Sequence, residues 1–110
     1  MTEVLLVCGK NGALKSLKAF GHASFAEKGK DIVCAAESII LGTSVELLQS
    51  TKGLVFNADT STRGFLEFRV EKSAVSAVER LKCIGDFIRF AFIKLSAEYP
   101  DNVRFQEIIE

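Results

Sequence analysis

The chain has 110 residues, of which 48% are apolar, and this length suits one hydrophobic core, so we expect a single domain over residues 1–110. Fourteen Lys and Arg side chains balance fourteen Asp and Glu side chains, which leaves no excess positive charge for direct nucleic-acid binding. Three cysteines without a Cys-x-x-Cys pair, together with one histidine, argue against a disulfide framework and against a zinc site. We expect reduced thiols, no metal ion and no cofactor.

The first two predicted elements are paired strands. Residues 3–8 and 13–20 flank the sequence Gly-Lys-Asn-Gly, in which Asn11 and Gly12 suit the positive φ angles of a tight hairpin turn. The apolar run at residues 4–8 is too short for a membrane span and lacks the flanks of a signal peptide. We therefore expect a cytoplasmic protein that does not bind a membrane.

The third predicted element is a helix over residues 31–50, preceded by a loop at residues 24–30. Asp31 is the candidate N-cap, and Gly53 lies beyond the helix end. Because apolar positions are denser than in a surface helix, we predict that this helix is largely buried and that Gly42 allows close packing on a neighbour.

The second half of the chain predicts strands at residues 54–58 and 65–70, a helix at 73–99 and a last strand at 103–109, with Pro100 ending the helix. The element order is thus ββαββαβ. Packing in two layers makes this an α+β sandwich, with a five-stranded, mostly antiparallel sheet and both helices on one face. The sequence does not give the order of the strands.

Two apolar residues of the second helix lie outside its main apolar stripe. Phe90 and Ile93 add more apolar surface than one sheet face covers. A homodimer would bury this surplus, and an ordinary scatter of exposed apolar groups explains it equally well.

The lone histidine and one cysteine lie in a position that suits nucleophilic catalysis. His22 follows the second strand, and Cys34 falls in the first turn of the predicted helix, where unpaired N–H groups and the helix dipole favour a thiolate by roughly 0.3–1 kcal/mol. An imidazole that takes the thiol proton adds a larger effect and can return that proton to a leaving amine. Cys8, at the end of an apolar strand, and Cys83, inside the second helix, occupy places where a thiol usually acts as a small hydrophobe. By spacing alone, however, a single Cys and a single His are more often structural than catalytic.

The stretch that contains these two residues, GHASFAEKGKDIVCAAES, resembles the signature of the bacterial ribosomal-processing cysteine protease family (Prp family). That family carries Gly-His-Ala at a strand end and Asp-x-Val-Cys-Ala-Ala at the start of a helix. The matching positions are Gly21, His22, Ala23, Gly29, Asp31, Val33, Cys34, Ala35, Ala36 and Ser38.

The resemblance implies a cysteine endopeptidase with His22 as base and Cys34 as nucleophile. The substrate that it implies is the short N-terminal extension of a large-subunit ribosomal protein, and the implied assembly is a homodimer. From the residues themselves we expect a polar lid formed by Lys28, Gly29 and Lys30, with Gly21 at its base.

Two further residues are expected to support the site, and one departs from the family pattern. Asp31 supports it as helix cap, and Ser38, one turn beyond Cys34, either bonds within the site or bonds a helix carbonyl. The oxyanion donor is the backbone N–H of Cys34 or a group in the turn at Gly21. Glu37 stands where the family usually has a small apolar residue. It either points away from the pocket, which we favour, or contacts a basic substrate segment.

Two other functions remain open at this point. One is a non-catalytic ribosome-assembly factor that binds the same N-terminal tail without cutting it. The other is a thiol-based redox or acyl-transfer protein that uses Cys34.

Overall fold

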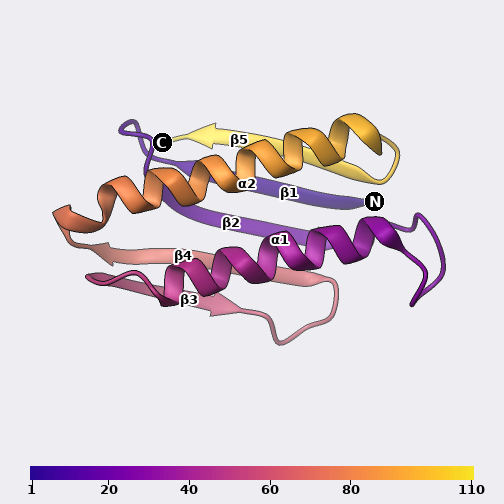
Figure 1. Cartoon of the computed structure of the whole chain (residues 1–110), viewed down its shortest axis with the longest axis horizontal. Coiled ribbons are helices and arrows are strands. Elements are labelled where there is room, and N and C mark those ends of the chain that lie inside the picture. The colour runs from indigo at the N-terminus through magenta and orange to yellow at the C-terminus, as the bar shows by residue number, and fades with distance from the viewer.

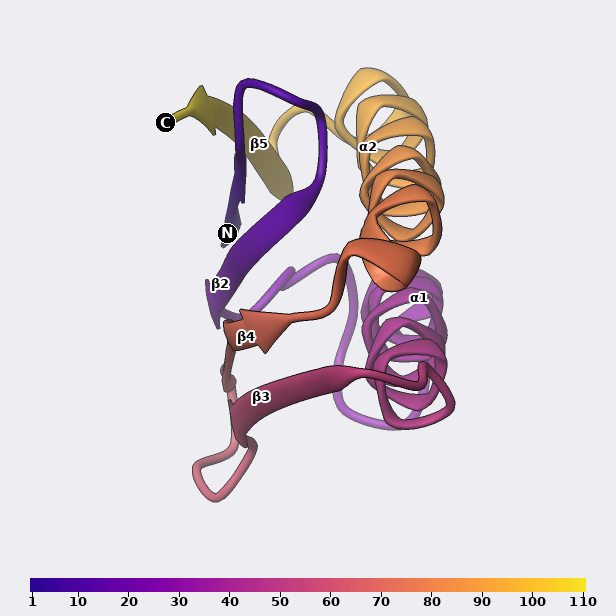
Figure 2. The same cartoon turned by 90° about the vertical axis from the view of Figure 1, so that its left-hand side faces the viewer.

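A computed structural model describes all 110 residues and shows five strands and two α-helices in two layers (Figure 1). Both helices cover the same face of the sheet (Figure 2), which confirms the predicted α+β sandwich and its ββαββαβ order. The elements are β1 (Thr2–Cys8), β2 (Leu14–Gly21), α1 (Ile32–Gln49), β3 (Leu54–Asp59), β4 (Phe65–Ser73), α2 (Val78–Glu98) and β5 (Val103–Ile109).

The strands follow the order β3-β4-β2-β1-β5 across the sheet. Strand β1 runs parallel to β5, and every other neighbouring pair is antiparallel, as the predicted mostly antiparallel sheet requires. Strand β2 lies between β1 and β4. Its last residues pair with Thr2 on one side and with Phe65 on the other. The residues that follow β2 therefore start between the first residues of β1 and the first residues of β4.

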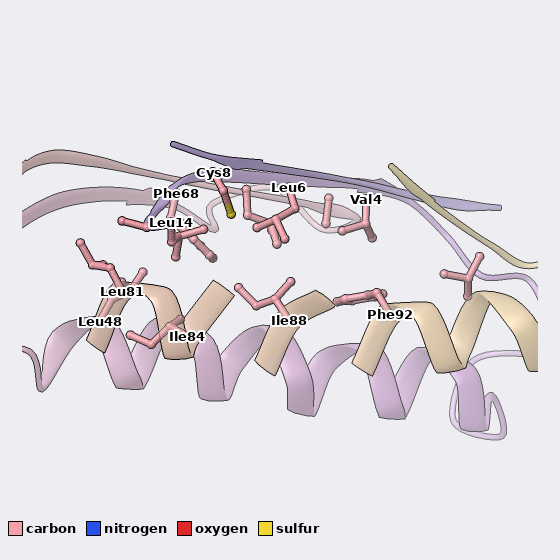
Figure 3. Packing of buried hydrophobic residues seen from close by; sticks show 14 of the residues in the cluster. Val4, Leu6, Cys8, Leu14, Leu48, Phe68, Leu81, Ile84, Ile88 and Phe92 are labelled. Carbon is pink, nitrogen blue, oxygen red and sulfur yellow. The ribbon is translucent and has the colours of Figure 1, made fainter. Parts of the chain in front are cut away.

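The core lies between the sheet and the two helices. Alternate residues of β1 point toward the helices, as expected of a strand with one covered face. Helix α2 directs a stripe of apolar side chains, at spacings of three and four, toward the sheet. Figure 3 shows the two sets facing each other, and burial of each side chain of this size contributes roughly 1.5–3 kcal/mol. The labelled members are Val4, Leu6, Cys8, Leu14, Leu48, Phe68, Leu81, Ile84, Ile88 and Phe92.

The prediction that the first helix is largely buried is wrong. Only Val33, Glu37, Ser44 and Leu48 of α1 are buried, while Ile39 is 71% exposed. Two helices side by side leave an outer face that nothing in the chain covers (Figure 2). Gly42 is exposed, and a Cβ there would meet no atom within 4 Å, so it does not mediate close packing either.

Helix α1 is also the one helix whose length and mean hydropathy, 1.5 over 18 residues, would allow it to cross a membrane. The packed helix of a soluble protein meets the same criterion, and α1 places Val33 and Leu48 in the core. Its composition is therefore weak evidence for a membrane span.

The second helix starts later than the sequence predicts. Residue Ser73 still belongs to β4, where it pairs with Leu54, and the N–H of Ala74 donates to the carbonyl of Gly53 at 2.7 Å. A short 3₁₀ turn over Val75–Ala77 follows. Sheet pairing thus overrides the helical periodicity up to this point.

Helix α2 leaves the predicted surplus of apolar surface in solvent. Phe90 is 59% exposed and Ile93 is 50% exposed. Cys83 is exposed on the same helix, so its predicted role as a small core residue is wrong, whereas Cys8 is buried as expected.

Candidate active site

The residues of the sequence motif meet others at one end of the molecule. Figure 1 shows the N-terminus, the start of α1, the loop before it and the β3–β4 connection at the same end. A cavity of about 410 Å³ opens there, which we call the site cavity. A second cavity of about 430 Å³, the loop cavity, adjoins it and shares several of its residues. Both are lined by His22, Ala23, Cys34, Ser38 and Arg63.

Cys34 lies in the first turn of α1, at the position that the sequence predicts. Asp31 is the N-cap residue, and its Oδ1 accepts a hydrogen bond of 2.9 Å from the backbone N–H of Cys34. The thiol is exposed and unbonded to any other cysteine. The helix start therefore presents Cys34 to both cavities, with one of its N–H groups already capped.

Asp31 also fixes the loop that precedes the helix. Its Oδ2 accepts from the backbone N–H groups of Phe25 at 3.0 Å and of Ala26 at 3.3 Å. The N–H of Cys34, and then those of Ala26 and Phe25, hold the pKa of Asp31 below its ordinary value. One carboxylate thus connects the helix start to the beginning of the loop.

The beginning of the loop is tethered to a second region, the turn before β5. The amide of Asn102 donates to the carbonyl of buried Ala23 at 2.9 Å. The rings of Phe25 and Tyr99 meet edge to face, with 5.3 Å between their centroids. Residues 23–26 are therefore held on both sides, and 27–30 carry fewer contacts.

The expected lid residues divide between these regions. Lys28 and Gly29 line the loop cavity, whereas Lys30 forms an exposed ion pair of 3.4 Å with Glu27. Gly21, expected at the base of the lid, is instead the last residue of β2. Its N–H donates to the carbonyl of Gly64 at 2.9 Å, so it belongs to the sheet.

His22 directly follows β2 and packs against the β3–β4 connection. A Cβ placed on Gly64 would lie 2.7 Å from Cε1 and 2.8 Å from Nε2 of His22, so the imidazole rests against this glycine. The backbone of Gly64 has a φ of 78°, which favours glycine for a second reason. Sequence analysis missed Gly64 and Arg63, because only the pairing of β4 with β2 brings them to His22.

We predict that Gly64→Ala displaces the imidazole without unfolding the protein. The new methyl group meets a side-chain ring that can move, so peptide cleavage should fall roughly tenfold to a hundredfold. The positive φ should lower the free energy of unfolding by about 1–2 kcal/mol. Cleavage rates and urea denaturation measure the two effects.

The matched control for this variant is Gly12→Ala. Gly12 has a similar φ of 85°, and its nearest neighbour is a carbon of Lys82 at 3.7 Å, an ordinary contact. The free energy of unfolding of Gly12→Ala should fall by about as much as that of Gly64→Ala, while Gly12→Ala should cleave the peptide at the wild-type rate. Equal cleavage by both variants would show that Gly64 does not position the imidazole.

Glu37 lies in the site cavity, so the expectation that it points away from the pocket is wrong. Its side chain is buried, and Oε1 accepts a hydrogen bond of 3.1 Å from the hydroxyl of Thr2. Its other oxygen, Oε2, has no hydrogen-bond partner. Burial, and secondarily the charge of Asp31, raises the pKa of Glu37 to about 7.

This raised pKa predicts a pH-dependent loss of stability. Between its ordinary value of 4.5 and about 7, Glu37 keeps its proton in the folded protein and loses it in the unfolded chain. The free energy of unfolding should therefore fall by up to about 3 kcal/mol from pH 4.5 to pH 8. Urea denaturation of wild type and Glu37→Gln at several pH values isolates this contribution, since glutamine does not titrate. Parallel stability profiles of the two proteins would contradict it.

Two other expectations concern the hydroxyl of Ser38 and the oxyanion donor. The hydroxyl of Ser38 lines both cavities but forms no hydrogen bond within the chain, either across the site or to a helix carbonyl. Of the oxyanion donors considered, the backbone N–H of Cys34 already donates to Asp31, and in the turn at Gly21 the N–H of Gly21 donates to the carbonyl of Gly64. Arg63 is the only Lys or Arg side chain that lines both cavities.

The arrangement brings a thiol at a helix start and an imidazole to the same cavity wall. The only hydrogen bond of Cys34 outside the helix ladder uses its backbone N–H, so the thiol is not bonded to His22 in this conformation. No group of three or more Cys, His, Asp and Glu residues is placed to hold a metal ion. A thiol at a helix start and an imidazole beside the same cavities can support acid–base and nucleophilic chemistry.

Comparison with known proteins agrees with this reading. The sequence profile of the family described as Cysteine protease Prp matches residues 1–104. No curated protein matches the sequence closely enough to count as a relative.

Several solved structures share the fold. The ribosomal processing protease Prp of S. aureus, in complex with a covalently linked product peptide, superposes with a TM-score of 0.84 at 22% identity, over 98% of this chain and 100% of that one. The same protease with a substrate peptide gives a TM-score of 0.77 at 22% identity, over 98% and 100% of the two chains. The protein SMU.848 of Streptococcus mutans also gives 0.77 at 22% identity, over 100% of this chain and 96% of that one.

Proposed function

Because the chain belongs to the Prp family of cysteine proteases, we propose that it removes a short N-terminal extension from a large-subunit ribosomal protein, with Cys34 as nucleophile and His22 as base. The observation that carries the proposal is the shared cavity wall: His22 at the end of β2 and Cys34 in the first turn of α1 line the same two cavities. The structure of S. aureus Prp with a covalently linked product peptide supports it by analogy of fold.

The proposed reaction follows from these two groups. The imidazole of His22 takes the proton of the Cys34 thiol, and the thiolate attacks the scissile carbonyl. As the peptide bond breaks, the imidazolium gives its proton to the leaving amine, and a thioester remains on Cys34. Water then hydrolyses the thioester, with His22 again as base, which frees the N-terminal fragment and restores the thiol.

The loop before α1 supplies the closure that this reaction needs. Since Asp31, Asn102 and Tyr99 tether residues 23–26, we propose that residues 27–30 move over the bound peptide. Closure would shorten the separation of thiol and imidazole. It would also exclude water from the two cavities.

The direct test uses the organism's own large-subunit ribosomal protein with its full N-terminus. Wild-type protein should release one N-terminal fragment, detected by intact-mass spectrometry, and Cys34→Ala should release none. Tight binding of the tail by both proteins without any cleavage would instead support the alternative, a ribosome-assembly factor that does not cut. The missing thiol–imidazole bond in this conformation is the observation that keeps this alternative in view.

We further propose that the protein acts in the cytoplasm as a homodimer that covers the exposed apolar residues of α2. Phe90 and Ile93 are each at least half exposed, and Phe87 lies on the same helix with 37% exposure. Truncating a hot-spot residue at the centre of an interface weakens the interface by about 2 kcal/mol or more.

We predict that Phe90→Lys shifts the protein from dimer to monomer. Light scattering after size exclusion measures the mass in solution. Gln49, an exposed polar residue of α1, provides the control, because Gln49→Lys also adds one positive charge but lies outside α2 and should leave a dimer. A monomeric wild type, or a Phe90→Lys dimer of unchanged affinity, would show that α2 is not the interface.

A further inference from the structure

Glu37 is a buried acid with an incomplete set of hydrogen bonds, in the cavity that contains His22 and Cys34. It is 5% exposed, and only Oε1 has a partner, the hydroxyl of Thr2 at 3.1 Å. Oε2 has none. A carboxylate with a purely structural role is expected to have both oxygens paired, because an unpaired buried oxygen is costly.

Apolar side chains line the same cavity as Glu37. Leu41, Phe65 and Leu66 line the same cavity and offer contacts to an aliphatic stem. Oε2 itself is covered in this conformation. The terminal torsion of glutamate is broad, and a substrate side chain would reach a carboxylate oxygen once the carboxyl group rotates.

Arg63, the only Lys or Arg residue that lines the site cavity, lies on the opposite side from Glu37. Thr2, the partner of Glu37, is in β1, whereas Arg63 precedes β4, and β2 separates these two strands. Arg63 forms no ion pair within the chain. The carboxyl and the guanidinium therefore do not neutralise each other, and no Lys or Arg side chain of the protein pairs with Glu37.

We propose that Glu37 is a specificity-determining residue, whose carboxylate accepts a charge-assisted hydrogen bond from a lysine or arginine side chain of the peptide next to the scissile bond. The inference rests on the proposed peptidase function, because it takes the site cavity as the peptide-binding site. It goes beyond that function by assigning the chemical class of one substrate residue.

The titration of Glu37 supports this assignment. Burial raises its pKa to about 7, with a smaller contribution from the negative charge of Asp31, while the hydroxyl of Thr2 and the N-terminal ammonium lower it. His22, Cys34 and Arg63 are the other titratable or charged groups that line the cavity. A bound substrate cation favours the ionised carboxylate, so selection for Lys and Arg should strengthen from pH 6 to pH 8.

The test is a library of capped peptides of mixed sequence, digested with wild type, Glu37→Gln and Glu46→Gln and analysed by mass spectrometry. Glu46 is an exposed acid of the same helix, so its variant controls for the loss of one charge. Wild type and Glu46→Gln should enrich Lys and Arg at one position beside the cut. In Glu37→Gln this preference should fall roughly tenfold to a hundredfold while cleavage continues.

A second measurement separates this inference from the peptidase function. Cys34→Ala protein is mixed with the same library, and the retained peptides are compared with those retained by the Cys34→Ala, Glu37→Gln double variant. Retention of Lys and Arg peptides that depends on Glu37 supports the inference, even if the wild type cuts nothing. A Lys and Arg preference that is absent, or is unchanged in both Glu37→Gln proteins, overturns it, whether or not the protein is a peptidase.

Discussion

Cys34→Ala should lower cleavage of the ribosomal substrate by at least about 10³-fold, because the nucleophile of the proposed reaction is lost. His22→Ala should lower it by roughly 10²–10⁴-fold, the usual contribution of a general base. Rates come from the mass of the released fragment over time, with both variants at equal concentration.

Two features of the structure make this prediction specific. Cys34 is exposed at a helix start, so its replacement by alanine should leave the free energy of unfolding nearly unchanged. Cys83 is a second exposed thiol on α2, away from both cavities, and Cys83→Ala is the matched control that should cleave at the wild-type rate. Substantial cleavage by Cys34→Ala would remove the thiol mechanism.

Gly21→Ala should produce the largest loss of stability among the substitutions considered, about 2–5 kcal/mol. A Cβ on Gly21 would overlap the carbonyl oxygen of Met1, a backbone atom next to Thr2, which pairs with Gly21 in the sheet. Its φ of 93° adds strain to any residue other than glycine. Because His22 follows directly, cleavage should fall with stability.

The control isolates the steric clash from the backbone strain. Gly12→Ala has a comparable φ, 85°, and meets no close atom, so it should lose only about 1–2 kcal/mol. Thermal and urea denaturation of the two variants measure the difference. If Gly21→Ala and Gly12→Ala lose the same free energy of unfolding, the contact of the added Cβ with Met1 does not destabilise the protein.

Much of the fold follows from local patterns in the sequence. Asn11 and Gly12 mark the first hairpin, Asp31 caps α1 as predicted, and β5 has the predicted bounds 103–109. The order of the strands does not follow, because the pairing of β4 with β2 depends on contacts between residues far apart in the chain. The same long-range pairing explains why the predicted start of the second helix at Ser73 is wrong.

The burial of α1 shows a different limit of sequence patterns. A dense run of apolar residues predicts a covered helix, yet Ile39 faces solvent because the chain has no third layer over the helices. Apolar density alone does not say whether another part of the chain or another copy covers a surface. The predicted surplus at Phe90 and Ile93 was easier to recognise, since these residues lie outside a clear helical stripe.

The sequence likewise predicts some residues of the candidate site and not others. His22, Asp31 and Cys34 were found because they lie within thirteen residues of one another in a recognisable motif. Gly64 and Arg63 reach the site from the β3–β4 connection, more than forty residues away from His22, and no local signal marks them. The place of Glu37 needed the structure, because the sequence does not show that this residue lines the site cavity and bonds Thr2.

The most direct test of the central claim, that His22 activates the Cys34 thiol, compares two thiols in one molecule. Iodoacetamide is added at pH 6, and alkylation of Cys34 and Cys83, both exposed, is followed by peptide mass spectrometry. The account predicts that Cys34 reacts at least about tenfold faster than Cys83, and that His22→Ala removes the difference. Equal rates in the wild type, or a Cys34 advantage that survives His22→Ala, would contradict it.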